Sequence, residues 1–189
     1  MVRVARMTSQ EFSDVLLAAQ SGGSWAFDRL YRAYGGSVTG YLRLQGAREP
    51  EDLSSEVFLS AFRTISRFTG DEAQFRAWLF TIAHRRLIDA RRAASRRLEI
   101  PVSDFAGLEP SETTVSSEVE IVLATERIRA LCNDLVPDQR NVLLLRLIGG
   151  LTIDEIADMI GKSPGAVKAL QRRGLAAMRR RLEREGVTL

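Results

Sequence analysis

Four polar side chains near the C-terminal end of the chain have the types and spacing for contact with nucleic acid. Lys168, Arg172 and Arg173 carry the positive charge that meets phosphates, and Gln171 can pair with base edges in a major groove. At helical spacing these side chains can project outward from an element whose apolar residues face inward. The pattern predicts a basic, DNA-contacting helix over residues 164–185.

The stretch Leu151–Leu175 has the spacing of a helix-turn-helix, which would position this basic helix. Ala157 is the small residue that lets a second helix cross the first closely, and Gly161 supplies a turn where a positive φ costs little. The expected shared core is Ile156, Ile160, Val167 and Leu170. Any helical hairpin can hold such residues, but their combination with a basic second helix favours DNA binding.

A second candidate site is the aromatic and arginine-rich run Phe75–Arg92. Its arginines can follow a phosphate backbone, and its aromatic rings offer platforms on which unpaired bases stack. Phe75 and Trp78 share a helix face, whereas Phe80 lies off that face. One or more of these three rings must therefore belong to the protein core.

The stretch Glu49–Phe68 predicts an acidic helix. Its outer face carries Glu49, Glu51, Asp52, Ser55 and Glu56. An acidic face and an arginine-rich face cannot both serve the same polyanion. The acidic face is either a protein-docking surface or an ordinary solvated helix face, and the residues alone favour neither.

Composition limits the other kinds of site. Cys132 and His84 are the only residues of their types, so no disulfide within the chain and no cysteine- or histidine-based metal site is expected. We expect Cys132 in the core and His84 on a helix surface or partly buried, with no metal, cofactor or small-molecule substrate. No apolar run reaches the ~20 residues that cross a bilayer, and the N-terminal residues lack a signal-peptide stretch. The sequence therefore predicts a cytoplasmic protein with no membrane insertion.

Charge is unevenly distributed along this chain of 189 residues with net charge +3. Residues 76–97 hold seven arginines and one acid, residues 98–126 hold seven acids and no base, and residues 162–184 hold eight bases and one acid. Two basic blocks separated by an acidic segment indicate two surfaces that face nucleic acid, joined by a spacer.

Helical spacing of apolar residues, without alternating strand patterns, predicts an all-α protein of two small helical domains. The first domain covers residues 9–95, with Gly35–Gly36 interrupting its second helix and Pro50 opening its third. A flexible acidic linker is expected over residues 96–117, which combine Pro, Gly, Ser and Thr. The second domain covers residues 118–189, with helices over 118–135, 138–149, 152–160 and 164–185.

The order of these motifs resembles that of bacterial RNA polymerase sigma factors of the extracytoplasmic-function (ECF) type. The motifs are the acidic helix with Asp52–Leu59, the following helix with Trp78–Arg92, a linker and a C-terminal helix-turn-helix. The resemblance covers about residues 26–94, as sigma domain two, and 124–182, as sigma domain four. It implies a subunit without catalysis that binds core RNA polymerase and directs transcription initiation at particular promoters, in response to stress or an envelope signal.

The resemblance also implies roles for individual residues. The residues expected to bind core polymerase are Asp52, Leu53, Ser55, Glu56 and Phe58. Those expected to recognise and melt the promoter −10 element are Phe75, Arg76, Trp78, Arg85, Arg86, Asp89, Arg91 and Arg92. Those expected to read the −35 element are Ser163, Gly165, Lys168, Gln171, Arg172 and Arg173. The implied partners are the β and β′ subunits of core RNA polymerase, promoter DNA and an anti-sigma factor.

Two positions depart from the family pattern. Family members often carry glutamine where this chain has Ser55, and asparagine where it has Arg85. Arginine is longer than asparagine, charged and a donor only. The sequence therefore predicts a −10 preference different from that of members with asparagine.

Two other function classes fit less well. A response regulator can end in a similar helix-turn-helix, but it would need an α/β receiver domain, and the N-terminal half shows no strand pattern. A nuclease would need clustered acids or a usable histidine. Asp52 and Glu56 lie one helical turn apart, but no matching acids complete a two-metal site.

Overall fold

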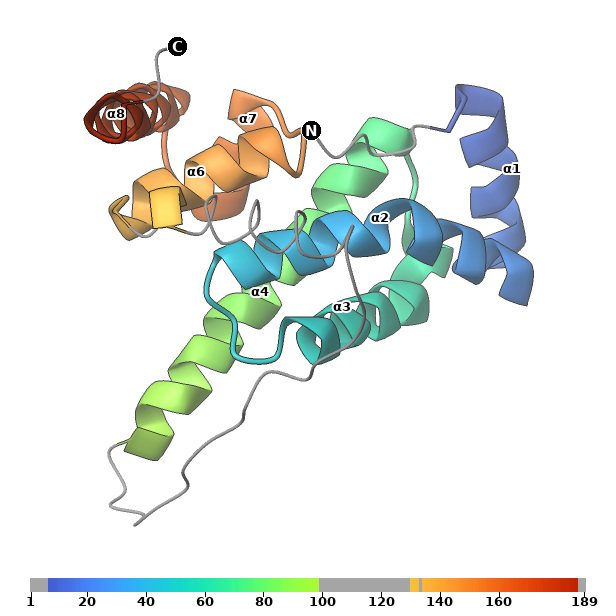
Figure 1. Cartoon of the computed structure of the whole chain (residues 1–189). Coiled ribbons are helices and arrows are strands. Elements are labelled where there is room, and N and C mark those ends of the chain that lie inside the picture. Colours follow the sequence, from blue (N-terminus) through green and yellow to red (C-terminus); the bar gives the residue numbers. More distant parts are fainter. Residues whose placement is uncertain (1–6, 99–129, 133, 187–189) are drawn as a thin grey trace.

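The computed structural model describes residues 7–98, 130–132 and 134–186, and within them no strand occurs (Figure 1). The elements are α1 (Ser9–Gln20), α2 (Ser24–Leu44), α3 (Pro50–Thr64), the 3-10 helix η1 (Ile65–Arg67), α4 (Glu72–Leu98), α6 (Pro137–Leu147), α7 (Ile153–Ile160) and α8 (Pro164–Arg184). Residues 130–132 are also helical. The all-α prediction is confirmed.

Helices α1 to α4 form an N-terminal unit, residues 7–98, around a shared apolar core. Phe75 of α4 lies at its centre, with its ring centroid 5.5 Å from that of Phe12 of α1 and 5.4 Å from that of Tyr34 of α2. All three rings are buried. The core forms because each helix carries apolar residues at three- and four-residue spacing and so presents one continuous face.

Helix α2 is continuous from Ser24 to Leu44, so the prediction that Gly35–Gly36 interrupt it is wrong. A glycine inside a helix costs about 1 kcal/mol relative to alanine. Here Gly35 lies on the buried side of α2, where a Cβ would meet the Tyr31 ring at 3.6 Å. Burial of Leu30, Tyr34 and Val38 on the same helix outweighs the weak local propensity.

Helix α4 runs to Leu98, beyond the predicted domain end at residue 95. The helix continues because no proline or glycine, the residues that end helices, occurs between Gly70 and Pro101. Arg96 to Leu98, expected in the linker, are therefore helical. The rest of the expected linker, 99–117, and residues 118–129 of the next expected helix lie outside the described residues.

Helices α6, α7 and α8, with residues 130–132, form a C-terminal unit that contains the predicted helix-turn-helix. The Thr152 side chain caps the start of α7 in a capping box with Glu155. Gly161 ends α7 with φ 66° and ψ 36°, the left-handed conformation predicted for it. Helix α8 begins at Pro164. The Ser163 side chain caps this helix by accepting a hydrogen bond from the Ala166 N–H.

The two units are in contact. Helix α6 packs against α2 of the N-terminal unit, and the buried apolar residues of both units form one cluster (Figure 1). Tyr41 and Phe80 lie on the N-terminal side of this contact, and Leu145 and Leu151 on the C-terminal side.

Candidate nucleic-acid interface

Helix α8 separates its polar and apolar side chains as the sequence predicts. Val167, Leu170 and Gly174 are buried against the rest of the C-terminal unit. At Gly174 a Cβ would lie 2.8 Å from Cδ1 of Leu143, so a larger residue there would require the Leu143 side chain to shift. The small residue that the sequence placed in the first helix of the motif, Ala157, is buried as well.

The opposite side of α8 carries the predicted reading residues. Lys168, Arg172 and Arg173 are exposed and Gln171 is half-buried. Ser163 and Gly165 are exposed at the start of the helix, where backbone N–H groups and the helix dipole favour phosphate. The Ser163 hydroxyl already accepts from the Ala166 N–H at 3.2 Å, so its first role is to cap the helix. The structure thus gathers this set on one accessible surface.

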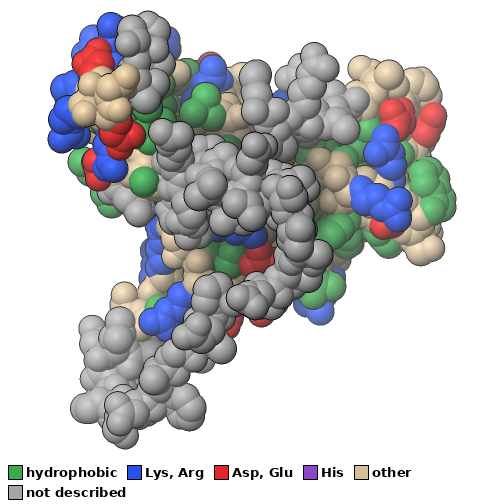
Figure 2. Space-filling view, viewed as in Figure 1, with side chains coloured by type: hydrophobic (Ala, Val, Ile, Leu, Met, Phe, Trp, Pro, Cys, Tyr) green, Lys and Arg blue, Asp and Glu red, His purple; other side chains and the backbone are tan. Residues whose placement is uncertain are grey.

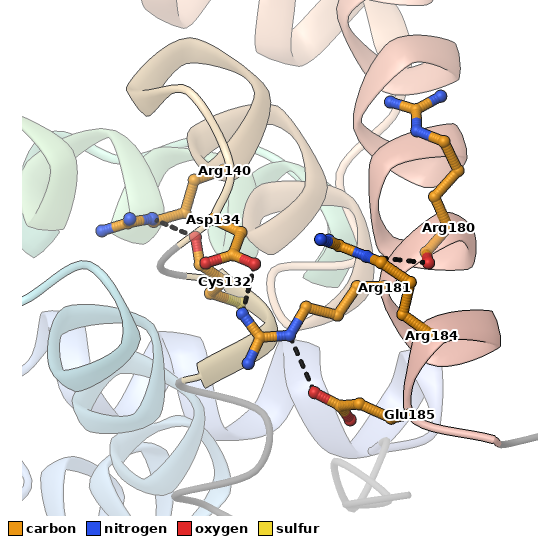
Figure 3. A network of polar contacts seen from close by, with 7 residues as sticks. All are labelled: Cys132, Asp134, Arg140, Arg180, Arg181, Arg184 and Glu185. Atoms are coloured by element: carbon orange, nitrogen blue, oxygen red, sulfur yellow. Dashed lines mark hydrogen bonds and ion pairs between the residues drawn. The ribbon is translucent and has the colours of Figure 1, made fainter.

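The C-terminal end of α8 is basic but partly neutralised. Arg181 pairs with Asp134 and donates from Nε to Glu185 at 2.8 Å, and Arg140 donates to the Cys132 carbonyl at 2.8 Å (Figure 3). The hydrogen bonds that Arg181 donates to Glu185 and Asp134 raise the pKa of Arg181. Lys and Arg side chains lie among Asp and Glu over this end of the molecule (Figure 2). Arg181 therefore ties α8 to the segment before α6 and is not free to contact DNA.

Helix α4 distributes its predicted nucleic-acid residues over different faces. Arg85, Asp89 and Arg92 are exposed, and Arg92 Nη1 lies 3.8 Å from Asp89 Oδ1. Trp78 is half-buried, with its ring centroid 5.1 Å from that of Phe68. At helical spacing, these four residues share one side of α4.

Phe75 does not belong to this exposed set. Its side chain has 0% exposure, and its ring packs against those of Phe12, Tyr34, Phe68 and Trp78. The structure thus places this member of the predicted −10 set in the core. Phe80 is also fully buried, with its ring centroid 5.5 Å from that of Tyr41. The prediction that at least one of the three rings belongs to the core is confirmed.

The remaining arginines of the predicted −10 set contact protein. Arg86 forms an ion pair with Glu56 of α3, with Nη1 and Oε2 3.6 Å apart. Arg91 donates to the backbone carbonyl of Gln45. The Arg76 Nε is buried and makes no hydrogen bond within the described residues. The sequence identified these arginines by type, and only packing shows which already have partners.

Helix α3 exposes the acidic face that the sequence predicts. Asp52, Ser55 and Glu56 are exposed and Leu53 is half-buried. Phe58, predicted among the polymerase-binding residues, is 3% exposed, and its ring packs on those of Tyr31 and Phe62 in the core. The exposed apolar side chain on this part of α3 is Leu59, at 58% exposure.

The single cysteine and the single histidine have the burial that the sequence predicts. Cys132 is buried, and burial raises the pKa of its thiol. His84 is half-buried, with Nδ1 3.0 Å from the Tyr41 hydroxyl oxygen. Within the described ranges, no group of three potential metal-binding side chains occurs, and none of the described helices is long and apolar enough to cross a bilayer.

Sequence reasoning missed a polar cluster where the two units meet. Tyr41 and Gln45 lie 100 and 96 residues before Asn141 in the sequence, and both donate a hydrogen bond to the same Asn141 oxygen. The only sign of this cluster in the sequence is Gln45, four residues after Tyr41 on the buried side of α2. That spacing does not identify the residue with which they form hydrogen bonds.

Family models of known proteins match both units. The model for Sigma-70 region 2 matches residues 30–97, and the model for Sigma-70, region 4 matches residues 125–178. The chain is similar to the ECF RNA polymerase sigma factor BldN of Streptomyces coelicolor. The two are 34% identical over 176 residues, which cover 92% of this chain and 67% of BldN.

Solved structures share the fold. CnrH, in complex with the cytosolic domain of CnrY, matches with a TM-score of 0.63 at 23% identity, covering 91% of this chain and 97% of CnrH. The sigma factor RpoE from Bartonella quintana, in complex with the anti-sigma factor NepR, matches with a TM-score of 0.56 at 18% identity. That match covers 92% of this chain and 95% of RpoE.

Proposed function

This chain belongs to the ECF RNA polymerase sigma factors, and we propose that its α3 binds core polymerase, its α4 opens the −10 element and its α8 reads the −35 element. Sigma factors of this family are initiation subunits that direct core RNA polymerase to promoters. The two matched regions lie in the two units of the structure, so the prediction of two sigma domains is confirmed.

The proposal for the −35 element rests on the accessible basic side of α8. Lys168, Arg172 and Arg173 project from a helix that is held at its start by a capped turn and along its length by close packing on α6. A rigid helix with donors on its outer side is the geometry that enters a major groove. Arg172 and Gln171 suit base edges, and Lys168 suits phosphate as well as guanine.

The exposed side of α4 supports the proposal for the −10 element. Arg85 and Arg92 can hold phosphates, and Trp78 offers a partly exposed ring on which an unpaired base can stack. Opening a base pair costs a few kcal/mol, and stacking contributes about 1–3 kcal/mol per base. Phe75 supports Trp78 from within the core, with ring centroids 5.5 Å apart, so its role is to position that ring.

The acidic face of α3 supports the proposal for core polymerase. Asp52, Ser55 and Glu56 are exposed on the opposite side of the helix from its buried Val57 and Phe58. Leu59 adds an exposed apolar contact, and protein interfaces combine such an apolar centre with a polar rim.

An anti-sigma factor is a further proposed partner, and no catalytic site is proposed. RpoE of Bartonella quintana, which shares the fold, was solved with an anti-sigma factor bound. We also propose that this protein acts in the cytoplasm, where core polymerase and promoter DNA are found. Stress or an envelope signal releases it from the anti-sigma factor.

Reconstitution with core polymerase that lacks any sigma factor tests the proposal. The wild-type chain should give discrete run-off transcripts from a library of genomic promoters. Lys168→Ala and Arg172→Ala should each reduce initiation at promoters that depend on the −35 element about 5- to 100-fold, the effect of losing one base or phosphate contact. Arg179→Ala removes the same charge from an exposed position farther along α8 and is the matched control.

DNA binding without polymerase association or initiation would refute the proposal. Equal effects of Arg172→Ala and Arg179→Ala would refute the assignment of α8 residues while leaving the sigma function intact.

A further inference from the structure

A glutamine of α1 contacts the segment that joins α3 to α4. The side-chain amide nitrogen of Gln20 donates to the Phe68 carbonyl at 2.8 Å and to the Ile65 carbonyl at 3.2 Å. Ile65 is the first residue of η1, and Phe68 follows the last residue of η1. The two N–H donors of one half-buried side chain therefore hold both ends of this 3-10 helix.

The backbone of Phe68 depends on this contact. Phe68 is extended, with φ −77° and ψ 134°, whereas Phe75 and Trp78 lie within α4 and are fixed by its helical hydrogen bonds. The Phe68 N–H donates to the Ile65 carbonyl at 3.0 Å, and Gln20 supplies a donor for the Phe68 carbonyl. That donor comes from a helix 48 residues earlier in the chain.

The Phe68 ring is a neighbour of Trp78. Its centroid lies 5.1 Å from that of Trp78 and 5.4 Å from that of Phe75. Rings at these separations are in contact and attract each other. Phe68 and Trp78 are both half-buried, so Phe68 borders the partly exposed ring on which an unpaired −10 base is proposed to stack.

The chain that follows Phe68 is closely packed as well. Gly70 has φ 150°, and a Cβ there would lie 3.1 Å from Cζ of Phe68 and 2.6 Å from Oε1 of Gln74. Asp71 and Gln74 each accept a hydrogen bond from the other's backbone N–H, at 2.9 Å, which fixes the start of α4. Phe68 thus lies between two fixed points, Gln20 on one side and the turn at Gly70 on the other.

Helix α1 reaches Trp78 by a second route, through the core. The Phe12 ring centroid lies 5.5 Å from that of Phe75, which lies 5.5 Å from that of Trp78. No residue of α1 is among those that the sequence assigned to the −10 element. The helix nevertheless supports the Trp78 ring twice, by apolar packing through Phe12 and by hydrogen bonding through Gln20.

We infer that Gln20 is a positioning residue for opening of the −10 element: its amide holds Phe68, and Phe68 holds the Trp78 ring in place for an unpaired base. A ring that is already in place binds more tightly, because ordering it on binding would subtract from the binding free energy. The inference rests on the proposed function, since α4 must receive that base.

Fluorescence of Trp78 in the full chain tests the positioning. Trp25 and Trp78 are the only tryptophans, and Trp25 is 58% exposed, so Trp25→Phe leaves Trp78 as the single emitter at little structural cost. In that background, Gln20→Met keeps the length of the side chain but loses both donors, and it should increase quenching of Trp78 by acrylamide. Gln10→Met makes the same change at an exposed position of α1 and is the matched control.

Promoter opening by the reconstituted polymerase tests the function. Permanganate reactivity of thymines in the −10 region of a duplex promoter measures the open-to-closed ratio. Gln20→Met should lower this ratio about two- to tenfold, the usual effect of one hydrogen bond. Gln20→Lys retains a donor for the Phe68 carbonyl and should stay near the wild type, as should Gln10→Met. Affinity for core polymerase and for a −35 duplex should be unchanged in every variant.

A double-mutant cycle separates positioning from general destabilisation. If Gln20 acts through the Trp78 ring, Gln20→Met should have no further effect on opening in a Trp78→Ala background. A general loss of stability would lower opening by the same factor in both backgrounds and would overturn the inference. Circular dichroism shows whether each variant is folded. Gln20→Glu, which replaces the donors by acceptors at the same size, is used if Gln20→Met does not fold.

The failure of this inference can be told apart from the failure of the proposed function. Unchanged opening or unchanged Trp78 quenching in Gln20→Met overturns only the role of Gln20, provided that Trp78→Ala lowers opening. Normal opening by Trp78→Ala overturns the assignment of α4 to the −10 element and the role of Gln20 with it.

Discussion

Residues of the same type have different roles here because of their place on a helix. Phe75 and Trp78 are one turn apart on α4, yet Phe75 has 0% exposure and Trp78 is only half-buried. Arg85 is exposed, while Arg86 beside it pairs with Glu56 at 3.6 Å. Such an exposed ion pair contributes at most about 1 kcal/mol, so polymerase or DNA can displace it cheaply.

Arg85 is expected to determine part of the −10 preference. Its exposed guanidinium presents only donors, whereas the asparagine common in the family presents a donor and an acceptor. Arg85→Asn should change the preferred base at one −10 position, by about 1–3 kcal/mol of discrimination, in promoter profiling on a randomised −10 library. Arg96→Asn, an exposed change of the same kind on α4, should not change the preference. An unchanged profile for Arg85→Asn would falsify the assignment.

His84 is expected to make stability depend on pH. Burial, and then the positive charge of Arg91, lower the pKa of His84 below its ordinary value of about 6.5. Tyr41 from α2 contacts His84 and Arg91 from α4 acts on its charge, while Arg140 from α6 acts on Arg91. The unfolded chain therefore binds a proton at a higher pH than the folded chain does, and stability falls as pH drops below about 6.5.

Urea unfolding of the wild type and His84→Gln between pH 8 and 5 measures this effect. The wild type should lose stability relative to the variant below about pH 6.5, by at most about 1.4 kcal/mol per pH unit. Above that pH the two curves should run parallel, offset by the lost Tyr41 hydrogen bond. Parallel curves over the whole range would mean that the folded and unfolded pKa values are equal.

At the scale of elements, caps and turns give the C-terminal helices their boundaries. Helices α7 and α8 begin at side-chain caps from Thr152 and Ser163, and α7 ends at Gly161. These local signals can be read from sequence because each acts within four residues. The continuity of α2 through Gly35–Gly36 depends on distant packing and could not be read in that way.

Gly161 is expected to be needed for its backbone conformation alone. Its φ is 66°, and a Cβ there would meet no atom within 4 Å. Gly161→Ala should therefore destabilise the protein by about 1–2 kcal/mol through left-handed strain, and Gly161→Asn should cost less. Gly165→Ala, also in open space but without positive φ, should stabilise by about 0.5–1 kcal/mol. Thermal unfolding checks all three, and equal losses for the two alanine variants would contradict the assignment.

At the scale of the whole molecule, the arrangement of the two units decides which surfaces are available. The exposed side of α8 is accessible, whereas Phe80 and Arg76 of α4 lie against the turn between α6 and α7. Holding both units on one polymerase raises the effective concentration of each for its promoter element. Neither unit then needs high affinity for DNA by itself.

DNA binding by α8 is expected to weaken as salt increases. Lys168, Arg172 and Arg173 are exposed, and cationic side chains that bind phosphates release counterions from DNA. Affinity for a −35 duplex should therefore fall steeply between about 0.05 and 0.5 M salt, with a slope of about −0.9 per phosphate contact. An affinity that stays constant over this range would show that α8 makes no phosphate contacts.

The amino-acid sequence by itself determined the all-α class, the helix-turn-helix and the acidic and basic helix faces. It did so because helix periodicity, caps and the Gly161 turn are local properties. Only the tertiary structure decided that Phe58 and Phe75 are core residues, because each lies at the meeting point of several helices. It also decided that Asn141 joins the two units, because that oxygen finds its donors 96 and 100 residues away, a separation that no local pattern encodes.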